Sequence, residues 1–187
     1  MIVIDDFFSD AEAVLAMART ATFDATHSYA GRGAFLHDCQ HQELMEAVSR
    51  RVECPISWAV KRASFRLALE GDKAAVMVHH DDTRSSDGVQ GRLHWTALVY
   101  LSKNPALTTC GLQFLYDPSR GASRVESGNE HQPMPQDGRY QVLGQVQAKF
   151  NRGIIFPSAS IHTQYGPSGF GSSLEDGRLI FAAWFYT

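Results

Sequence analysis

Residues 76–82 read Val76-Met77-Val78-His79-His80-Asp81-Asp82, an apolar run that ends abruptly in two imidazoles and two carboxylates. Successive side chains of a β-strand point to opposite faces, so a His and an Asp two positions apart project from the same face. Such a pair can supply two ligands to a metal ion, but a strand that ends in solvent also finishes in polar residues. Features elsewhere in the chain must therefore decide what this stretch does.

Two overlapping His-x-Asp pairs compete for that face, His79 with Asp81 and His80 with Asp82. A shift of one residue turns every side chain to the other face of a strand, so the two pairs cannot serve one site together. The preceding residues 75–78 are apolar on both faces. The residues alone therefore leave both registers open.

The composition is that of one globular domain with a substantial core, because 44% of the 187 residues are hydrophobic and 20% are charged. A net charge of -3 argues against a general surface for nucleic acid or anionic membranes. Cys39, Cys54 and Cys110 are widely spaced, which predicts free thiols in a reducing compartment and hence a cytoplasmic protein. The sequence has neither a signal-peptide pattern nor an apolar run of about 18 residues, so we expect no membrane partner. The oligomeric state is left open.

Two helices are expected in the first third of the chain. Ser9 and Glu12 form a capping-box pattern, which predicts that the first helix starts at Ser9. Apolar residues recur every four positions over residues 40–52, which predicts a second amphipathic helix. The residues between them, 24–38, are rich in turn formers and are predicted to form a loop.

From residue 57 the hydrophobic pattern changes to a period of two, which is typical of β-strands. Short strands separated by turns predict a mainly β (α+β) fold, a double-stranded β-helix or jelly roll, with the N-terminal helices packed on the outside of one sheet. We expect one domain over residues 1–187, with an N-terminal strand and helices in 1–56 and the jelly-roll core in 57–187. The expected strands cover residues 2–4, 65–69, 73–78, 93–102, 111–116, 140–150, 153–156, 161–165 and 179–186.

A long polar segment with three prolines, residues 118–138, interrupts these strands. A loop of this length inside a compact domain is typical of an active-site lid, a binding loop or a disordered segment. This segment is therefore a candidate lid, and the sequence leaves open whether it is ordered.

A further histidine, His162, follows a buried strand and a tight turn near the C-terminus. With one of the His-x-Asp pairs it completes a 2-His-1-carboxylate triad, the ligand set that holds non-haem Fe(II) and leaves coordination positions open. Arg178 stands before a wholly apolar final strand, where a guanidinium needs a carboxylate partner. Neither neighbouring acid, Glu175 or Asp176, is an obvious partner for it.

With these motifs in this order, the chain resembles the Fe(II)/2-oxoglutarate-dependent dioxygenases, in particular their prolyl-hydroxylase-like branch. The resemblance covers residues 62–187 well and the first 50 residues loosely, and it rests on the ordered set of motifs. The motifs are Val78-His79-His80-Asp81, Val99-Tyr100-Leu101-Ser102, Gly111-Leu112-Gln113-Phe114, Phe156-Pro157-Ser158 with His162, and Gly177-Arg178-Leu179-Ile180.

The resemblance implies that His79, Asp81 and His162 bind Fe(II). It favours this register because the family has an aliphatic residue directly before its first ligand histidine, as Val78 stands before His79. The resemblance thus disfavours the alternative pair of ligands, His80 with Asp82, but does not exclude it.

The resemblance also implies a cosubstrate site in which Arg178 pairs with the distal carboxylate of 2-oxoglutarate. The Tyr100 hydroxyl is expected to help, with Thr96 on the same face of the strand. The chain departs from the family at Ile180, where a Ser or Thr is common, at Leu112, where the family has a second Gly, and at residues 167–176, which resemble an insertion. Substrate contacts are expected from His94, Arg84, Trp184 and Arg120.

The implied reaction uses O2 and 2-oxoglutarate to hydroxylate a C–H bond of a small-molecule metabolite, such as an amino acid or a natural-product intermediate, and gives succinate and CO2. Desaturation or ring formation are alternative outcomes, and a peptidyl or protein substrate is an alternative to a metabolite. Two other classes stay open: a cupin-like metal or ligand-binding module without 2-oxoglutarate chemistry, and a structural sandwich without activity. Tight binding of 2-oxoglutarate distinguishes the dioxygenase from both.

Overall fold

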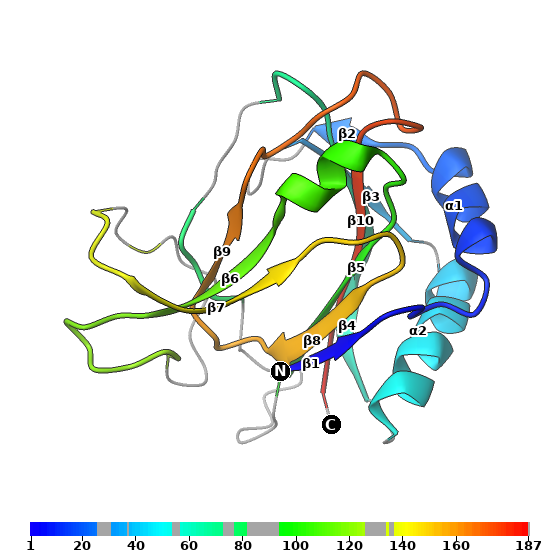
Figure 1. The fold of residues 1–187 in the computed structure, drawn as a ribbon. Coiled ribbons are helices and arrows are strands. Elements are labelled where there is room, and N and C mark those ends of the chain that lie inside the picture. Colours follow the sequence, from blue (N-terminus) through cyan, green and yellow to red (C-terminus); the bar gives the residue numbers. More distant parts are fainter. Residues whose placement is uncertain are drawn as a thin grey trace.

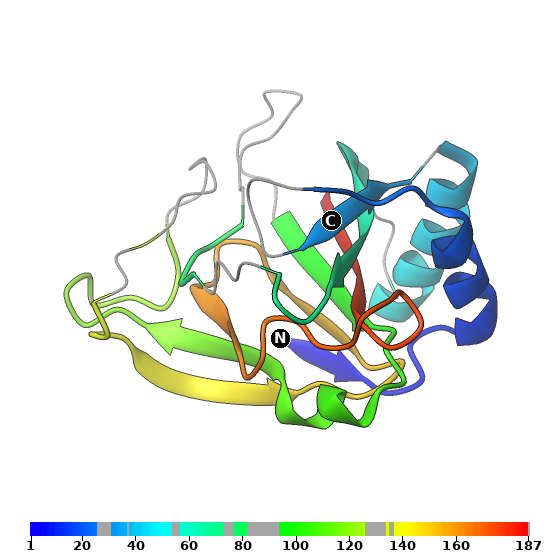
Figure 2. The same ribbon diagram turned by 90° about the horizontal axis from the view of Figure 1, so that it is seen from above.

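The computed structural model describes residues 1–25, 31–36, 38–53, 57–72, 77–81, 94–125, 134 and 137–186. Two antiparallel β-sheets face each other, and two helices cover the far side of the larger sheet (Figures 1 and 2). The large sheet has the spatial order β1 (Ile2–Ile4), β8 (Gly153–Pro157), β5 (His94–Tyr100), β10 (Arg178–Tyr186), β4 (Ser57–Ala68), β3 (Arg32–Phe35) and β2 (Asp24–Ala25). The small sheet has the order β7 (Gln141–Gln147), β6 (Gly111–Tyr116) and β9 (His162–Tyr165).

The helices are α1 (Ala11–Thr20) and α2 (Asp38–Val52), with a short 3-10 helix, η1 (Pro105–Thr109), ahead of β6. This confirms the expected mainly β protein with antiparallel sheets and two outer helices, an arrangement consistent with a jelly-roll-type fold. The N-terminal region contributes more than expected to the core, because β1, β2 and β3 all extend the large sheet.

The first helix begins one residue later than the capping-box pattern predicted. Asp10, not Ser9, is the N-cap, and its carboxylate accepts a hydrogen bond from the Ala13 N–H at 2.9 Å. A carboxylate satisfies a free N–H at the helix start and also interacts favourably with the helix dipole. The second helix ends at Val52 as predicted.

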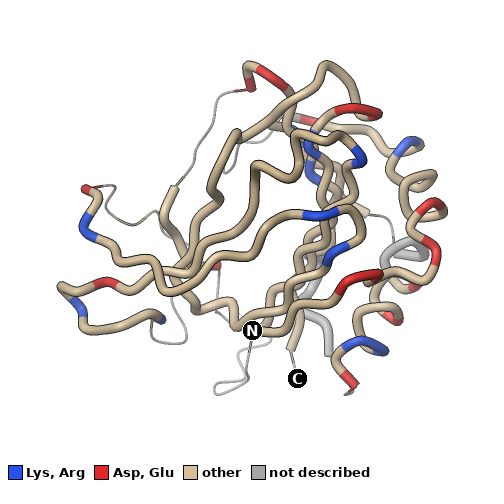
Figure 3. The backbone as a smooth tube through the Cα atoms, in the orientation of Figure 1, with Lys and Arg blue, Asp and Glu red and all other residues tan. Residues whose placement is uncertain are grey.

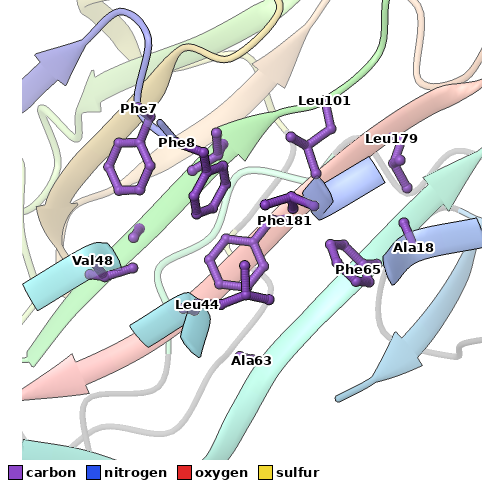
Figure 4. Packing of buried hydrophobic residues seen from close by; sticks show 14 of the residues in the cluster. Phe7, Phe8, Ala18, Leu44, Val48, Ala63, Phe65, Leu101, Leu179 and Phe181 are labelled. Atoms are coloured by element: carbon purple, nitrogen blue, oxygen red, sulfur yellow. The ribbon is translucent and has the colours of Figure 1, made fainter. Parts of the chain in front are cut away.

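The larger part of the core lies between the helices and the large sheet. Odd-numbered residues of β10, including Leu179 and Phe181, point toward the helices, whereas the even-numbered Ile180 belongs to a second cluster between the two sheets. Leu44 and Val48 of α2 pack against this outer face together with Phe8, whose ring lies 5.6 Å from that of Phe181 (Figure 4). This packing fixes which face of each central strand is directed at the interior between the sheets.

Two short strands, β2 and β3, replace parts of the loop that was predicted over residues 24–38. Residues 32–35 form β3, which pairs with β4 so that Gly33 lies opposite Arg66. Gly31 turns the chain into this strand with φ of +91°, and a Cβ there would lie 2.2 Å from the Leu67 carbonyl oxygen. The loop prediction was wrong here because glycines that permit close approach to a neighbouring strand look like turn residues in the sequence.

Acidic and basic residues are interspersed over the helical layer (Figure 3). Arg19 of α1 pairs with Glu175 at 2.7 Å, and both side chains are exposed, so the pair contributes little to stability. In the part of the chain that the structure describes, no helix has the length and apolar character needed to cross a membrane.

Candidate metal centre

Backbone hydrogen bonds bring His79 and His162 together from distant parts of the sequence. The His79 N–H donates to the His162 carbonyl at 3.0 Å, and the His162 N–H donates back at 2.9 Å, which forms an isolated antiparallel bridge. The Asp81 N–H continues the pairing with a bond of 2.9 Å to the Ser158 carbonyl. The two segments that carry the predicted ligands are thus joined directly to each other.

This bridge replaces the strand that was expected to carry His79. Within the predicted strand 73–78, residues 73–76 lie outside the described residues, and Met77 and Val78 are not part of a regular strand. The prediction of a regular strand ending at the motif was therefore wrong for its last two residues. Among the described residues, the backbone of His79 is held by its pairing with His162.

Both imidazoles have the same hydrogen-bond partner, the backbone carbonyl two residues earlier. The Nδ1 atom of His79 lies 2.7 Å from the Met77 carbonyl oxygen, and that of His162 lies 2.8 Å from the Ser160 carbonyl oxygen. A carbonyl oxygen only accepts, so Nδ1 carries a proton, and Nε2 has a lone pair whenever the ring is neutral. Both rings therefore present the nitrogen that binds a metal, in the tautomer that a metal site needs.

Asp81 completes the group. One potential ligand atom from each of His79, Asp81 and His162 lies within 4.8 Å of the others, and Asp81 Oδ2 is 3.9 Å from His162 Nε2. The alternative register is only partly visible, because Asp82 lies outside the described residues. His80 is buried, and its Nδ1 lies 2.8 Å from the Asp81 carbonyl oxygen. Within the described ranges, the structure brings the ligand atoms of the first register together.

The surroundings of Asp81 favour its ionised form. Burial by itself raises the pKa of the carboxyl, but the charges of His162 and His79, the Thr96 hydroxyl and the charge of Arg66 outweigh it and hold the pKa below the ordinary value. An ionised, buried carboxylate beside two imidazole rings is suited to a divalent cation, which the rings bind in their neutral form.

Aromatic side chains line one side of this group. The Phe156 ring centroid is 4.9 Å from that of His162, and the Phe114 ring lies 5.2 Å from Phe156. An apolar wall limits solvent access and lowers the local dielectric constant, which strengthens the electrostatic interactions at a metal site.

Arg178 lies on the inner face of the large sheet at the start of β10. It is buried, and among the described residues its Nε atom has no hydrogen-bond partner. Burial lowers the pKa of the guanidinium, but an arginine side chain keeps its charge in proteins. A buried charge without a partner is costly, so this position is typical of a binding site for an anion.

Tyr100 lies next to Arg178 on the same face, because Tyr100 pairs with Ile180 across β5 and β10. Its hydroxyl is buried and also has no hydrogen-bond partner among the described residues. Burial raises the pKa of this hydroxyl, so it stays protonated and can donate. The structure thus places two unsatisfied buried donors on neighbouring positions of one face.

Thr96 shares the inner face with Tyr100, as predicted from their even spacing, but its hydroxyl is engaged elsewhere. Thr96 Oγ1 lies 2.6 Å from Asp81 Oδ2 and 2.9 Å from Ser158 Oγ. In this structure its contact is therefore with a predicted metal ligand and not with the Arg178 region.

The residues predicted to contact substrate differ in their placement. Trp184 is half-buried on β10 opposite Thr96, and the His94 ring lies 4.4 Å from that of Tyr186. Arg120 is exposed on a turn, where its Nε lies 3.5 Å from Asp117, so the structure gives it no place at the metal group. Arg84 lies outside the described residues.

Parts of the predicted lid, residues 118–138, are bound to the segments that carry the ligands. The Met134 N–H donates to the Val78 carbonyl at 2.9 Å, and the Val125 N–H donates to the Ala159 carbonyl at 3.0 Å. Met134 is buried in a small cluster with Leu115. Val125 and Met134 are therefore bonded to backbone close to the ligand residues, whereas residues 126–133, 135 and 136 lie outside the described residues.

Two residues at the site had no role in the sequence prediction. Arg66 of β4 lies on the inner face, with its guanidinium carbon 4.8 Å from the Trp184 ring centroid. Its alternation with the buried Phe65 and Leu67 suggests a solvent-facing side chain, but in a protein with two facing sheets the alternate face is the interior. Ser158 belongs to a quoted motif, and its position just after a buried strand end was the available signal.

A scan against models of protein families gives no match, and a search of curated proteins finds no relative. Among solved structures, the chain is similar to SnoN, a non-haem α-ketoglutarate-dependent epimerase from nogalamycin biosynthesis, with a TM-score of 0.59 and 16% sequence identity. The match covers 99% of this chain and 77% of that chain. The fold is shared. At this level of identity, the likeness carries no residue roles from one protein to the other.

Proposed function

We propose that this protein is an Fe(II)- and 2-oxoglutarate-dependent oxygenase. The observation that carries the proposal is the pair of unsatisfied buried donors, Arg178 and Tyr100, in the same interior as the His79, Asp81 and His162 group. A metal group alone fits a cupin-like module equally well. A buried guanidinium on the inner face of the same sheet, with no carboxylate of its own among the described residues, calls for an anionic cosubstrate.

The residues fit a resident Fe(II) ion. Two imidazole nitrogens and one ionised carboxylate form the 2-His-1-carboxylate set, which leaves coordination positions for cosubstrate and O2. When bound, the iron supplies the oxidation chemistry, while the protein positions the substrate and excludes water. The aromatic wall of Phe156 and Phe114 serves the exclusion of water.

The strand β5 sets the length of the cosubstrate site. Its inner face carries Thr96, which contacts Asp81, and four residues further Tyr100, which neighbours Arg178. Four residues of strand span about 13 Å, and the side chains reach inward from both ends. A short dicarboxylate lying along β5 would direct one end toward the metal group and the other toward Arg178, where a charge-assisted hydrogen bond would hold it.

The reaction that we propose converts a substrate C–H bond, 2-oxoglutarate and O2 into the hydroxylated product, succinate and CO2. The similarity to SnoN, itself named an epimerase, adds epimerisation to the outcomes worth testing. Labelled O2 separates the two, because hydroxylation puts one oxygen atom of O2 into the product and epimerisation puts in none.

The finer assignments stand as proposals within this one. They are membership of the prolyl-hydroxylase-like branch, a small-molecule substrate, no nucleic-acid or membrane partner, and a cytoplasmic location. For the substrate side we favour Trp184, because its half-buried ring lies on the inner face below the Arg66 guanidinium and next to Thr96.

Slow turnover of 2-oxoglutarate without added substrate provides a direct test. Purified protein with Fe(II), 2-oxoglutarate and air should release succinate, and Asp81→Ala should abolish this release. Full activity in the Asp81→Ala variant would refute the assigned triad. Succinate release that is independent of Fe(II) would refute the proposed cofactor.

A further inference from the structure

We propose that Thr96 and Ser158 form a positioning pair that orients the carboxylate of Asp81 for metal binding. The inference rests on the proposed metal site and adds two residues to it. Both hydroxyls are buried, with Thr96 on β5 and Ser158 in the turn between β8 and β9. Neither side chain is itself placed as a metal ligand.

The chemistry of the groups fixes the direction of the hydrogen bonds. The ionised carboxylate of Asp81 only accepts, so the Thr96 hydroxyl must donate across the 2.6 Å contact to Oδ2. Thr96 Oγ1 can then only accept from Ser158 Oγ at 2.9 Å. The result is a one-way chain in which Ser158 donates to Thr96 and Thr96 donates to Asp81.

The backbone of Ser158 connects the turn after β8 to two other segments, the one that carries Asp81 and the start of β5. Its carbonyl accepts from the Asp81 N–H at 2.9 Å, and its own N–H donates to the His94 carbonyl at 2.9 Å. Ser158 therefore joins the start of β5 to the segment that carries Asp81, while its hydroxyl acts on the Asp81 side chain through Thr96. The distance between the Thr96 hydroxyl and the carboxylate is set by this framework.

The oxygen that accepts from Thr96 is also the one near the other ligands. Asp81 Oδ2 lies 3.9 Å from His162 Nε2. A short hydrogen bond at this oxygen prevents free rotation of the carboxylate about its Cβ–Cγ bond and keeps it aimed at the imidazoles. Removal of a group that orients a metal ligand in this way typically weakens metal binding about 10–100-fold.

Metal affinity of the apo protein, measured by calorimetric titration with Co(II) or Mn(II), tests the proposal without relying on activity. Thr96→Val keeps the shape of the side chain and removes the donor, and we expect the Kd to rise about 10–100-fold. Thr96→Ser keeps the hydroxyl and should bind like wild type. Ser158→Ala should show a smaller loss than Thr96→Val, because the bond from Thr96 to Asp81 remains.

Thr163→Val is the matched control. Thr163 is a buried threonine on β9 beside His162, and its hydroxyl bonds the Gln164 carbonyl instead of Asp81. Apo melting temperatures show whether each variant folds. If folded Thr96→Val binds metal like wild type, or if Thr163→Val loses as much affinity, the positioning role is wrong. If wild type itself binds no metal, the proposed function fails first, and the two failures are thereby distinguished.

Discussion

The Nε atom of Arg178 and the hydroxyl of Tyr100 lie in one buried interior, and neither has a hydrogen-bond partner among the described residues. Two neighbouring inward-facing positions on β10 and β5 thus hold donors that folding alone does not satisfy. These unsatisfied donors lower the stability of the folded protein, and we attribute their presence to a role in binding a dicarboxylate.

Arg178→Met should therefore separate stability from binding. The change replaces an unpaired buried charge by an apolar side chain, and the metal-free protein should be more stable by about 1 kcal/mol, or roughly 2–4 °C in Tm. Loss of a charge-assisted hydrogen bond should weaken 2-oxoglutarate binding at least about 10-fold. Differential scanning calorimetry and titration measure the two effects. A marked fall in the Tm of apo Arg178→Met would show that Arg178 has a stabilising partner in the folded protein.

Tyr100→Phe should have the same pattern with smaller amplitude. Removal of an unsatisfied buried hydroxyl should leave the apo Tm unchanged or slightly raised, since no hydrogen bond is lost. Loss of one neutral hydrogen bond should raise the Kd for 2-oxoglutarate about 2–10-fold. An unchanged Kd, measured by the same titration, would remove Tyr100 from the cosubstrate site.

Two strand glycines provide a test of the fold itself. A Cβ at Gly153 of β8 would lie 2.1 Å from Cδ2 of the buried Phe7, whereas a Cβ at Gly144 of β7 meets nothing within 4 Å. Gly153→Ala should lower the free energy of unfolding by about 1–3 kcal/mol through overpacking. Gly144→Ala should be neutral or nearly so. Equal effects of the two substitutions in urea denaturation would contradict the packing of β8 against Phe7.

Asp81 should make the stability of the metal-free protein depend on pH in acid. Burial raises the pKa of this carboxyl, but His162, His79, Thr96 and Arg66 lower it further than burial raises it. A carboxyl whose pKa is lowered on folding contributes stability that is present above its unfolded pKa of about 3.9 and is lost as the pH falls through the folded pKa.

The difference in Tm between wild type and Asp81→Asn should therefore shrink as the pH falls below about 4. Both proteins are measured with EDTA, so that no metal contributes. A difference that grows toward lower pH would contradict the direction assigned to the Asp81 pKa.

The local sequence pattern was sufficient for two strands of the sheets. Residues 111–116 were predicted with the bounds of β6, and β10 was predicted to within one residue as a wholly apolar run, which is typical of a strand that is buried on both faces. The local pattern failed at residues 32–35, whose strand character depends on pairing with β4, and at Met77 and Val78, where a single bridge to His162 replaces a regular strand. Pairing of distant segments is not encoded in local pattern.

At the site, too, local pattern predicted some residues, whereas contacts between distant segments were missed. The spacing of His79 and Asp81 and the isolated charge of Arg178 were visible in the sequence, because each conflicts with its apolar context. The hydrogen bond from Thr96 to Asp81 was not, because parity gives the face of a strand but not the partner across the interior. Ser158 was missed for the same reason.

The central claim is that one interior binds both Fe(II), through His79, Asp81 and His162, and 2-oxoglutarate, through Arg178. The most direct measurement is the visible absorption spectrum of the protein mixed anaerobically with Fe(II) and 2-oxoglutarate. We predict a metal-to-ligand charge-transfer band that requires both components, is absent in His162→Ala and needs a higher 2-oxoglutarate concentration in Arg178→Met. Absence of the band in wild-type protein that is folded by circular dichroism would contradict the account.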